Sequence, residues 1–125
     1  MSDLDQYAVE LHSFVAARGW DAFQNPKNLA MALGGESGEL LALLQWLTPE
    51  EAAARPFEDP EFRRELAHEL ADILNYLLRL SRSAGIDLLA AAREKLALNE
   101  QRYPVELARG NALKYDRLTE AGEQA

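Results

Sequence analysis

Residues 35–47, GESGELLALLQWL, and residues 68–80, HELADILNYLLRL, decide the fold, because each stretch carries two acids on the apolar face of a predicted helix. At about 3.6 residues per turn, Glu36 and Glu39 share one apolar stripe, and Glu69 and Asp72 share another. The apolar residues are Leu29, Ala32, Leu33, Leu40, Leu43 and Leu47 in the first stripe and Phe62, Leu66, Ile73, Tyr76, Leu77 and Leu80 in the second. The pattern predicts two helices that each point two acids inward.

Acids in this position are unfavourable unless another group compensates their charge. An unpaired ionised carboxylate is strongly disfavoured in an apolar interior. Two carboxylates about 4 Å apart repel by about 4 kcal/mol at an effective dielectric constant of ~20. The whole stability of a small domain is only about 5–15 kcal/mol. A bound cation removes the conflict, and a ligand set made only of oxygen suits a hard ion such as Mg2+.

Composition and charge limit the classes of function. The chain has 125 residues, no cysteine and a formal net charge of -8. The length predicts a single domain, which we place over residues 1–115, and the last ten residues, 116–125, are predicted to form a flexible acidic tail. The charge argues against a nucleic acid polymer as partner, and no apolar run is long enough for a membrane span. The missing cysteines and the absence of a signal-peptide pattern agree with a cytoplasmic protein.

Helix signals recur along the chain, and no stretch alternates with the period of a strand. We expect helices from about residue 3 to Gly19, from residue 26 to about Trp46, from Pro60 to Gly85 and from about residue 88 to Arg102. A capping-box pattern at 48–51 predicts a short helix that fades at 54–56. An arm follows at 105–115. The expected fold is all-α, with four main helices forming a bundle.

Three segments together resemble a known family, the all-α nucleoside triphosphate pyrophosphohydrolases of the MazG-like superfamily, and within it the dCTP pyrophosphatase branch. The segments are WDAFQNPKNLAMALGGESGELLALLQW at 20–46, ELADILNYLLRL at 69–80 and KLALNEQRYPVELARG at 95–110, followed by Lys114 and Tyr115. The resemblance implies a MazG-type bundle with a short extra helix and a C-terminal arm. It also implies a homo-oligomer, as a tetramer built from two dimers. The implied reaction is Mg2+-dependent hydrolysis of dCTP or a modified dCTP to the monophosphate and pyrophosphate, with Mn2+ as a substitute metal.

The same resemblance implies roles for individual residues. Glu36, Glu39, Glu69 and Asp72 would be the metal ligands and catalytic acids. The base and sugar pocket would be formed by His12, Trp20, Gln24, Trp46 and Tyr76. Phosphate contacts would come from Lys95, Asn99 and Arg102, which fall on one face of a helix, and from Lys114 on the arm.

Other interpretations of these residues stay open at this point. One or two acids could form salt bridges with arginines, the aromatic residues could be ordinary core, and His12 could lie on the surface. The chain could also be a non-enzymatic helical interaction module. A di-iron carboxylate bundle is a further alternative, since Glu65 and His68 form one E-x-x-H pair. Such a site requires this motif from two helices, and the sequence contains it once.

Overall fold

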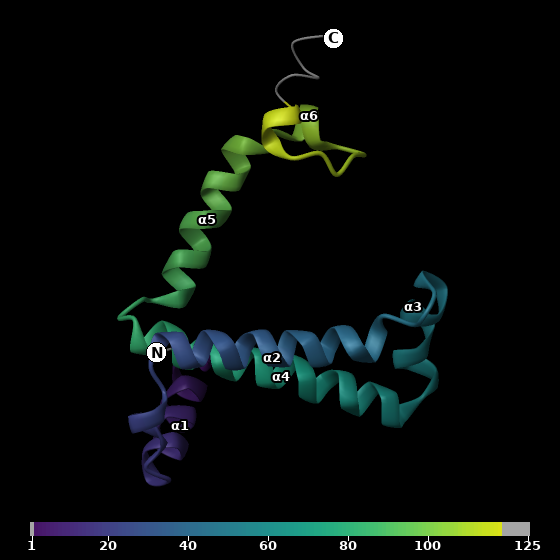
Figure 1. The fold of residues 1–125 in the computed structure, drawn as a ribbon. Helices are drawn as coiled ribbons and strands as arrows, with labels where there is room; N and C mark the ends of the chain where they lie inside the picture. The colour runs from purple at the N-terminus through teal and green to yellow at the C-terminus, as the bar shows by residue number, and fades with distance from the viewer. Residues whose placement is uncertain (1, 119–125) are drawn as a thin grey trace. The chain divides into compact units, whose positions relative to one another are not determined.

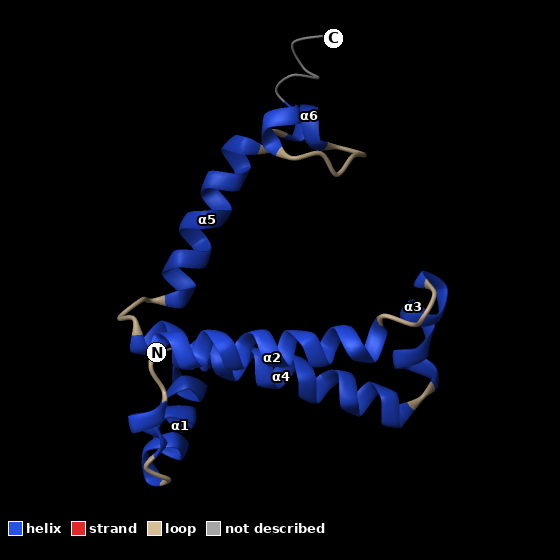
Figure 2. Cartoon of the chain, in the orientation of Figure 1, coloured by secondary structure: helices blue, strands red, loops and turns tan. Residues whose placement is uncertain are grey.

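The computed structural model describes residues 2–118, and every regular element in that range is a helix (Figure 2). The elements in chain order are α1 (Asp3–Ala17), the 3-10 helix η1 (Trp20–Phe23), α2 (Pro26–Leu44), α3 (Pro49–Glu58), α4 (Pro60–Ser83), α5 (Leu88–Arg102) and α6 (Val105–Ala108). The prediction of an all-α chain is confirmed for the described residues. None of the described helices is both long and apolar enough to cross a membrane.

Two compact units divide the chain, Met1–Ile86 and Asp87–Ala125. The first unit contains α1, η1, α2, α3 and α4, and the second contains α5 and α6 (Figure 1). The four-helix bundle and the single domain over 1–115 stay predictions, because both concern how α5 packs on the first unit. Of the predicted acidic tail, residues 119–125 lie outside the described part of the chain, and Leu118 just before them is buried.

The first unit is built around α2 and α4, which lie side by side, with α3 connecting the end of α2 to the start of α4 (Figure 1). Leu29 of α2 is buried, and so are Phe62 and Leu78 of α4. Helix α1 also contacts α4 and contributes the buried Val15. Because α2 and α4 are the two helices that carry the inward-facing acids, their packing brings the acids of both sequence stretches to one interface.

Side-chain caps explain where the helices begin. Ser2 and Thr48 each accept a hydrogen bond in a capping box, and Asn25, Asp59 and Asp87 accept from the first backbone N–H groups of α2, α4 and α5. Such caps satisfy N–H groups that have no partner inside the helix. The predicted starts of these helices are therefore confirmed.

Two predicted helix ends differ from the structure. Helix α2 ends at Leu44, two residues before Trp46. Helix α3 continues through Pro56 to Glu58, so the predicted fading at 54–56 is wrong. A proline near the end of a helix removes only one hydrogen bond of that helix. The carbonyl of Pro56 accepts a hydrogen bond from the guanidinium of Arg63 on α4 at 3.3 Å, which ties the end of α3 to the next helix.

Glycine ends α1 and α4 as predicted. Gly19 and Gly85 both have a φ of 67°. This left-handed conformation is strained for residues with a Cβ atom and is common just after a helix. The turn at Gly19 leads into η1, which places Trp20 and the residues after it against the end of α1.

The cap of α4 allows a direct test of this local account. The carboxylate of Asp59 accepts hydrogen bonds from the backbone N–H groups of Glu61 at 3.1 Å and of Phe62 at 3.2 Å. We expect Asp59→Ala to lower the free energy of unfolding by about 1 kcal/mol, measured by urea denaturation. The matched variant Asp59→Asn keeps an acceptor and should lose much less. Equal stability of Asp59→Ala and the wild type would contradict the role of this cap.

Candidate functional site

Three carboxylates from two helices converge where α2 and α4 pack. Glu36 lies on α2, and Glu69 and Asp72 lie one turn apart on α4. One carboxylate oxygen from each of the three residues lies within 4.8 Å of the others. Three oxygens at this spacing can all contact a single divalent ion. The structure thus brings together three of the four acids that the sequence predicts as metal ligands.

The electrostatics of this acid cluster favour a positive partner. Burial, as the largest cause, and the negative charges of Glu39 and Asp72 together raise the pKa of Glu36 to about 7. The Oε2 atoms of Glu36 and Glu69 are buried without a hydrogen-bond partner among the described residues. A buried oxygen without a partner is costly. These atoms fit a hard divalent cation, which accepts oxygen ligands and compensates their charge.

Glu39, the fourth predicted ligand, lies outside this group of three oxygens in the structure. Its side chain is exposed, and it lines a cavity of about 430 Å³ together with Glu69, Glu65 and His68. The influence of Glu39 on Glu36 is through its charge and hydrogen bonding. His68, the residue behind the di-iron alternative, borders this cavity and offers no ligand atom to the group formed by Glu36, Glu69 and Asp72.

An aromatic pocket of about 270 Å³ adjoins the acid cluster. Three of the predicted base-binding residues, Trp20, Gln24 and Tyr76, line it. The full lining consists of Leu11, Phe14, Val15, Trp20, Gln24, Asp72, Asn75, Tyr76 and Arg79. Trp20 meets Phe14 edge to face, with ring centroids 5.8 Å apart. Asp72 therefore belongs both to the acid cluster and to the wall of the pocket.

Arg79 is the central residue of this region, and the sequence analysis missed it. Its side chain is buried, with an exposed fraction of 5%. Its Nε donates to Oε1 of Gln24 at 2.6 Å, one Nη donates to Oδ1 of Asp21 at 2.6 Å, and the other lies 3.1 Å from Nδ1 of His12. The spacing from Asp72 and Tyr76 on the same helix face could have indicated it, since an arginine on an inward face needs partners.

His12, predicted in the base pocket, is a partner of Arg79 and is not among the residues that line the pocket. Burial lowers the pKa of His12, and the positive charges of Arg82 and Arg79 lower it further. A guanidinium carries donors only, so Nδ1 of His12 must be the acceptor in this contact. His12 is thus held neutral, with its ring proton on Nε2.

Trp46 lies beyond the end of α2 and is 86% exposed, away from the residues that line the aromatic pocket. Within the first unit, Trp46 therefore does not line the pocket in which it was predicted. A tryptophan exposed to this degree is unusual for a monomeric protein surface.

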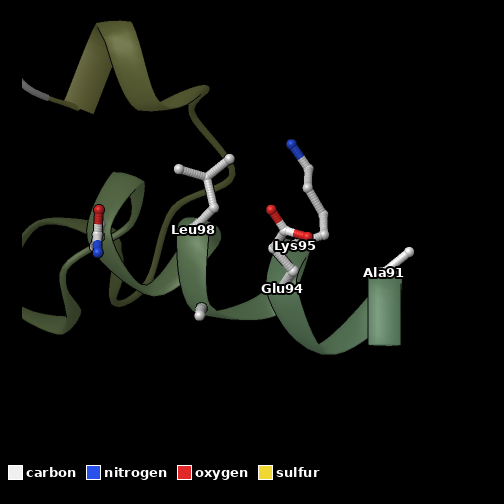
Figure 3. A pocket seen from close by; sticks show the side chains of 6 residues that line it. Ala91, Glu94, Lys95 and Leu98 are labelled. Atoms are coloured by element: carbon white, nitrogen blue, oxygen red, sulfur yellow. The ribbon is translucent and has the colours of Figure 1, made fainter. Parts of the chain in front are cut away.

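The predicted phosphate-binding residues belong to the second unit. Lys95, Asn99 and Arg102 lie on α5, and Lys114 follows α6. Figure 3 shows Lys95 and Glu94 beside Leu98 at a shallow cavity of about 450 Å³ that is lined only by residues of α5. The guanidinium of Arg102 lies 4.5 Å from the ring centroid of Tyr115. The action of these four residues on a phosphate stays a prediction.

Several known proteins are similar to this chain. dCTP pyrophosphatase 1 of Rattus norvegicus is 44% identical over 106 residues, covering 84% of this chain and 62% of the relative. The Homo sapiens protein of the same name is 42% identical over 109 residues, covering 86% of this chain and 64% of the relative. The chain thus spans under two thirds of the length of these curated relatives.

A solved structure is similar over almost its full length. The crystal structure of a pyrophosphatase from Archaeoglobus fulgidus matches with a TM-score of 0.72 and 35% identity, covering 83% of this chain and 94% of that chain. No protein-family model matches the chain.

The neutral His12 predicts a specific dependence of stability on pH. Its native pKa lies below the ordinary value of 6.5, so the unfolded chain binds more protons in the interval between the two values. The contribution of His12 to stability is therefore complete above 6.5 and is lost as the pH falls through the native pKa. We expect the wild type to lose more unfolding free energy than His12→Asn as the pH falls below 6.5.

Chemical denaturation of both proteins across this interval measures the effect. Asparagine keeps an acceptor near the position of Nδ1 but does not titrate, so the difference between the two proteins isolates His12 from the other titrating groups. Parallel stability curves for the wild type and the variant would show that His12 is not held neutral.

Proposed function

The chain belongs to the MazG-like superfamily of all-α nucleoside triphosphate pyrophosphohydrolases, and we propose on this premise that it hydrolyses dCTP or a modified dCTP to the monophosphate and pyrophosphate with Mg2+ as cofactor. The substrate is a small-molecule nucleotide rather than a nucleic acid polymer. The net charge of -8 supports this, because binding to a phosphate backbone requires a basic surface.

One observation carries the proposal: Asp72 connects the acid cluster with the aromatic pocket. Its carboxylate lies with those of Glu36 and Glu69, and its side chain also lines the wall that contains Trp20 and Tyr76. A nucleoside triphosphate is polyanionic at one end and aromatic at the other. A site for a cation directly beside a pocket for one aromatic ring matches both ends of such a molecule.

The acids would hold the metal and handle the proton of the attacking water. Glu36, Glu69 and Asp72 would ligate Mg2+, and Mn2+ uses the same oxygen ligands. When bound, such an ion supplies charge neutralisation and Lewis acidity at the phosphate oxygens. Glu39 lies one turn from Glu36 on α2 and would complete the ligand set or accept a proton from the water.

The aromatic pocket would bind the base. Its volume of about 270 Å³ is near the lower limit of ~300 Å³ for ligand sites, which suits one small ring system. Trp20 and Tyr76 supply flat faces for stacking, worth about 1–3 kcal/mol for each base in single-stranded nucleic acid sites. Phe14 packs against Trp20 and thereby holds its ring in place.

Charged and polar side chains of the second unit would bind the phosphate chain. Lys95 and Lys114 provide ammonium groups, Asn99 provides an amide, and Arg102 provides a guanidinium already placed over Tyr115. Charge-assisted hydrogen bonds to phosphate oxygens are about twice as strong as neutral ones. These residues would hold the pyrophosphate as it leaves.

We also propose that the protein is a homo-oligomer and, following the family resemblance, a tetramer of two dimers. Large apolar side chains are exposed on the single chain, including Trp46 at 86%, Phe57 at 83% and Phe23 at 70%. Gly34 and Gly38 lie one turn apart on α2, and a Cβ added to either would meet no atom within 4 Å. Apolar surface on this scale marks an interface, and a second copy is the simplest partner for it.

Removal of one acid tests the proposed activity. We expect Glu69→Gln to lower the rate of pyrophosphate release from dCTP with Mg2+ by at least about 100-fold, because second-shell changes alone cost 10–100-fold at metal sites. Glu61→Gln is the matched control, since it makes the same change on α4 outside the acid cluster and should stay near the wild-type rate. Full activity of Glu69→Gln would refute the assignment of the site.

Magnesium should also change stability in a way that depends on the same acids. A ligand that binds only the native state at 100 times its Kd stabilises it by about 2.7 kcal/mol, so Tm should rise during a magnesium titration. Glu36→Gln should raise Tm of the metal-free protein, because it removes repulsion within the acid cluster. The same variant should reduce the rise that magnesium causes.

Thermal denaturation followed by circular dichroism measures both effects. The opposite signs separate a metal site from a general salt effect, which would shift the wild type and Glu36→Gln alike. Identical magnesium responses in the two proteins would count against a cation site at Glu36.

A further inference from the structure

Two amide side chains, Gln24 and Asn75, line the aromatic pocket, and both have their oxygen atoms occupied by donors of the protein. Nε of Arg79 donates to Oε1 of Gln24 at 2.6 Å. The hydroxyl of Tyr7 on α1 donates to Oδ1 of Asn75 on α4. An amide has one acceptor oxygen and one NH2 donor group. With one lone pair of the oxygen bound by the protein and the amide held in that orientation, the NH2 group is the main group left for a ligand.

The orientation of Gln24 is dictated by chemistry. A guanidinium has five N–H donors and no acceptor, so only the oxygen of Gln24 can face Arg79. Arg79 is itself held in place, because it is buried and also bonded to Asp21 and His12. The amide of Gln24 therefore cannot rotate to offer its oxygen without leaving a buried guanidinium N–H group unpaired, which is costly.

Asn75 has a related arrangement on α4; a tyrosine hydroxyl can donate or accept, so here the polarity rests on the observed bond, in which Tyr7 donates. It lies one turn after Asp72 on α4, and its amide oxygen is bound from α1 by Tyr7. The family resemblance gives this position no role. The contact also joins α1 to α4, so a purely structural role is the competing explanation, and an experiment must separate the two.

We propose that Gln24 and Asn75 form a donor-only pair that reads the edge of the bound base, and that Arg79 and Tyr7 are positioning residues that set this polarity. The proposal rests on the proposed function, since it takes the ligand to be a nucleotide. It assigns to Asn75 a ligand contact, and to Arg79 an effect on specificity through Gln24.

The chemistry of such a pair selects among bases. Cytosine is the base with two neighbouring acceptors, N3 and O2, on its hydrogen-bonding edge. Uracil and thymine have an N–H donor at position 3 between two carbonyl oxygens, and guanine has an N–H donor beside an amino group. A donor facing a donor leaves both groups unpaired, which disfavours those bases. Position 5 of cytosine is not on this edge, so the pair accepts 5-methylcytosine equally.

An isosteric exchange of amide for acid reverses the polarity of the pair. In Asn75→Asp, Tyr7 can still donate to one carboxylate oxygen, and the second oxygen replaces the NH2 donor with an acceptor. We expect the ratio of kcat/KM for dCTP to kcat/KM for dUTP to fall at least about tenfold. The substitution replaces one hydrogen bond to cytosine by a contact between two acceptors, one of them charged. Gln24→Glu should shift the ratio in the same direction.

The ratio separates base reading from other effects of the substitution. Added charge near Asp72, or a partial loss of stability, acts equally on both substrates and cancels in the ratio. Gln6→Glu is the matched control, because it makes the same amide-to-acid change at an exposed residue next to Tyr7 and should leave the ratio unchanged. Tyr7→Phe frees the amide of Asn75 without adding charge, and it should lower the ratio by a smaller factor.

If Asn75 has only a structural role, the expected results differ. Asn75→Asp and Tyr7→Phe would then lower Tm and slow both substrates alike, and an unchanged ratio in Asn75→Asp and Gln24→Glu would overturn the proposal. If Asn75→Asp does not fold, Asn75→Leu replaces it in the test, because it removes the NH2 donor without adding charge and should also lower the ratio. Absence of pyrophosphate release by the wild type would instead refute the proposed function.

In that case binding measurements still decide the inference. Calorimetric titration with dCMP and dUMP should show that the wild type prefers dCMP and that Asn75→Asp loses this preference. Equal affinities of the wild type for the two nucleotides would overturn the donor-only pair.

Discussion

Repulsion between acids on two packed helices is the constraint on which the rest of the structure depends. Glu36 of α2 meets Glu69 and Asp72 of α4 at the interface that also forms the main packing of the first unit. Burial and neighbouring charge raise the pKa of Glu36 to about 7, so the protein alone does not keep Glu36 fully ionised near neutral pH. A bound cation is the simplest compensation. The same packing that builds the fold therefore creates the demand for a ligand.

A second centre of opposite charge lies two turns along the same helix. Arg79 is buried and bonded to His12 of α1, Asp21 of η1 and Gln24, the residue after η1. Helix α4 thus places a negative group near its middle and a positive group near its end, with Tyr76 between them. The negative group suits a metal and phosphate, and the positive group fixes the polar side chains of the pocket. One face of α4 therefore positions both the acid cluster and the aromatic pocket.

The single chain leaves a large part of its apolar surface uncovered. Trp46 in the connection between α2 and α3 and Phe57 near the end of α3 are exposed, and the buried core of the first unit is small. Small cores give limited stability. Burial of these faces between copies of the chain would supply what the separate unit lacks, and it would place Trp46 in contact with another surface. Assembly and the completion of the site would then have the same physical origin.

The sequence alone determined the helices, their caps and the two pairs of acids, because these depend on local chemistry and on a spacing of 3–4 residues. It also predicted Trp20, Gln24 and Tyr76, which the fold brings into one pocket. Only the tertiary structure separated Glu39 from the group formed by the other three acids, removed His12 from the lining of the pocket and placed Arg79 in that lining. The hydrogen bond from Arg63 of α4 to Pro56 near the end of α3 is likewise a tertiary contact. These outcomes depend on contacts between residues such as Arg79 and His12, which are 67 positions apart, and no local pattern encodes such a contact.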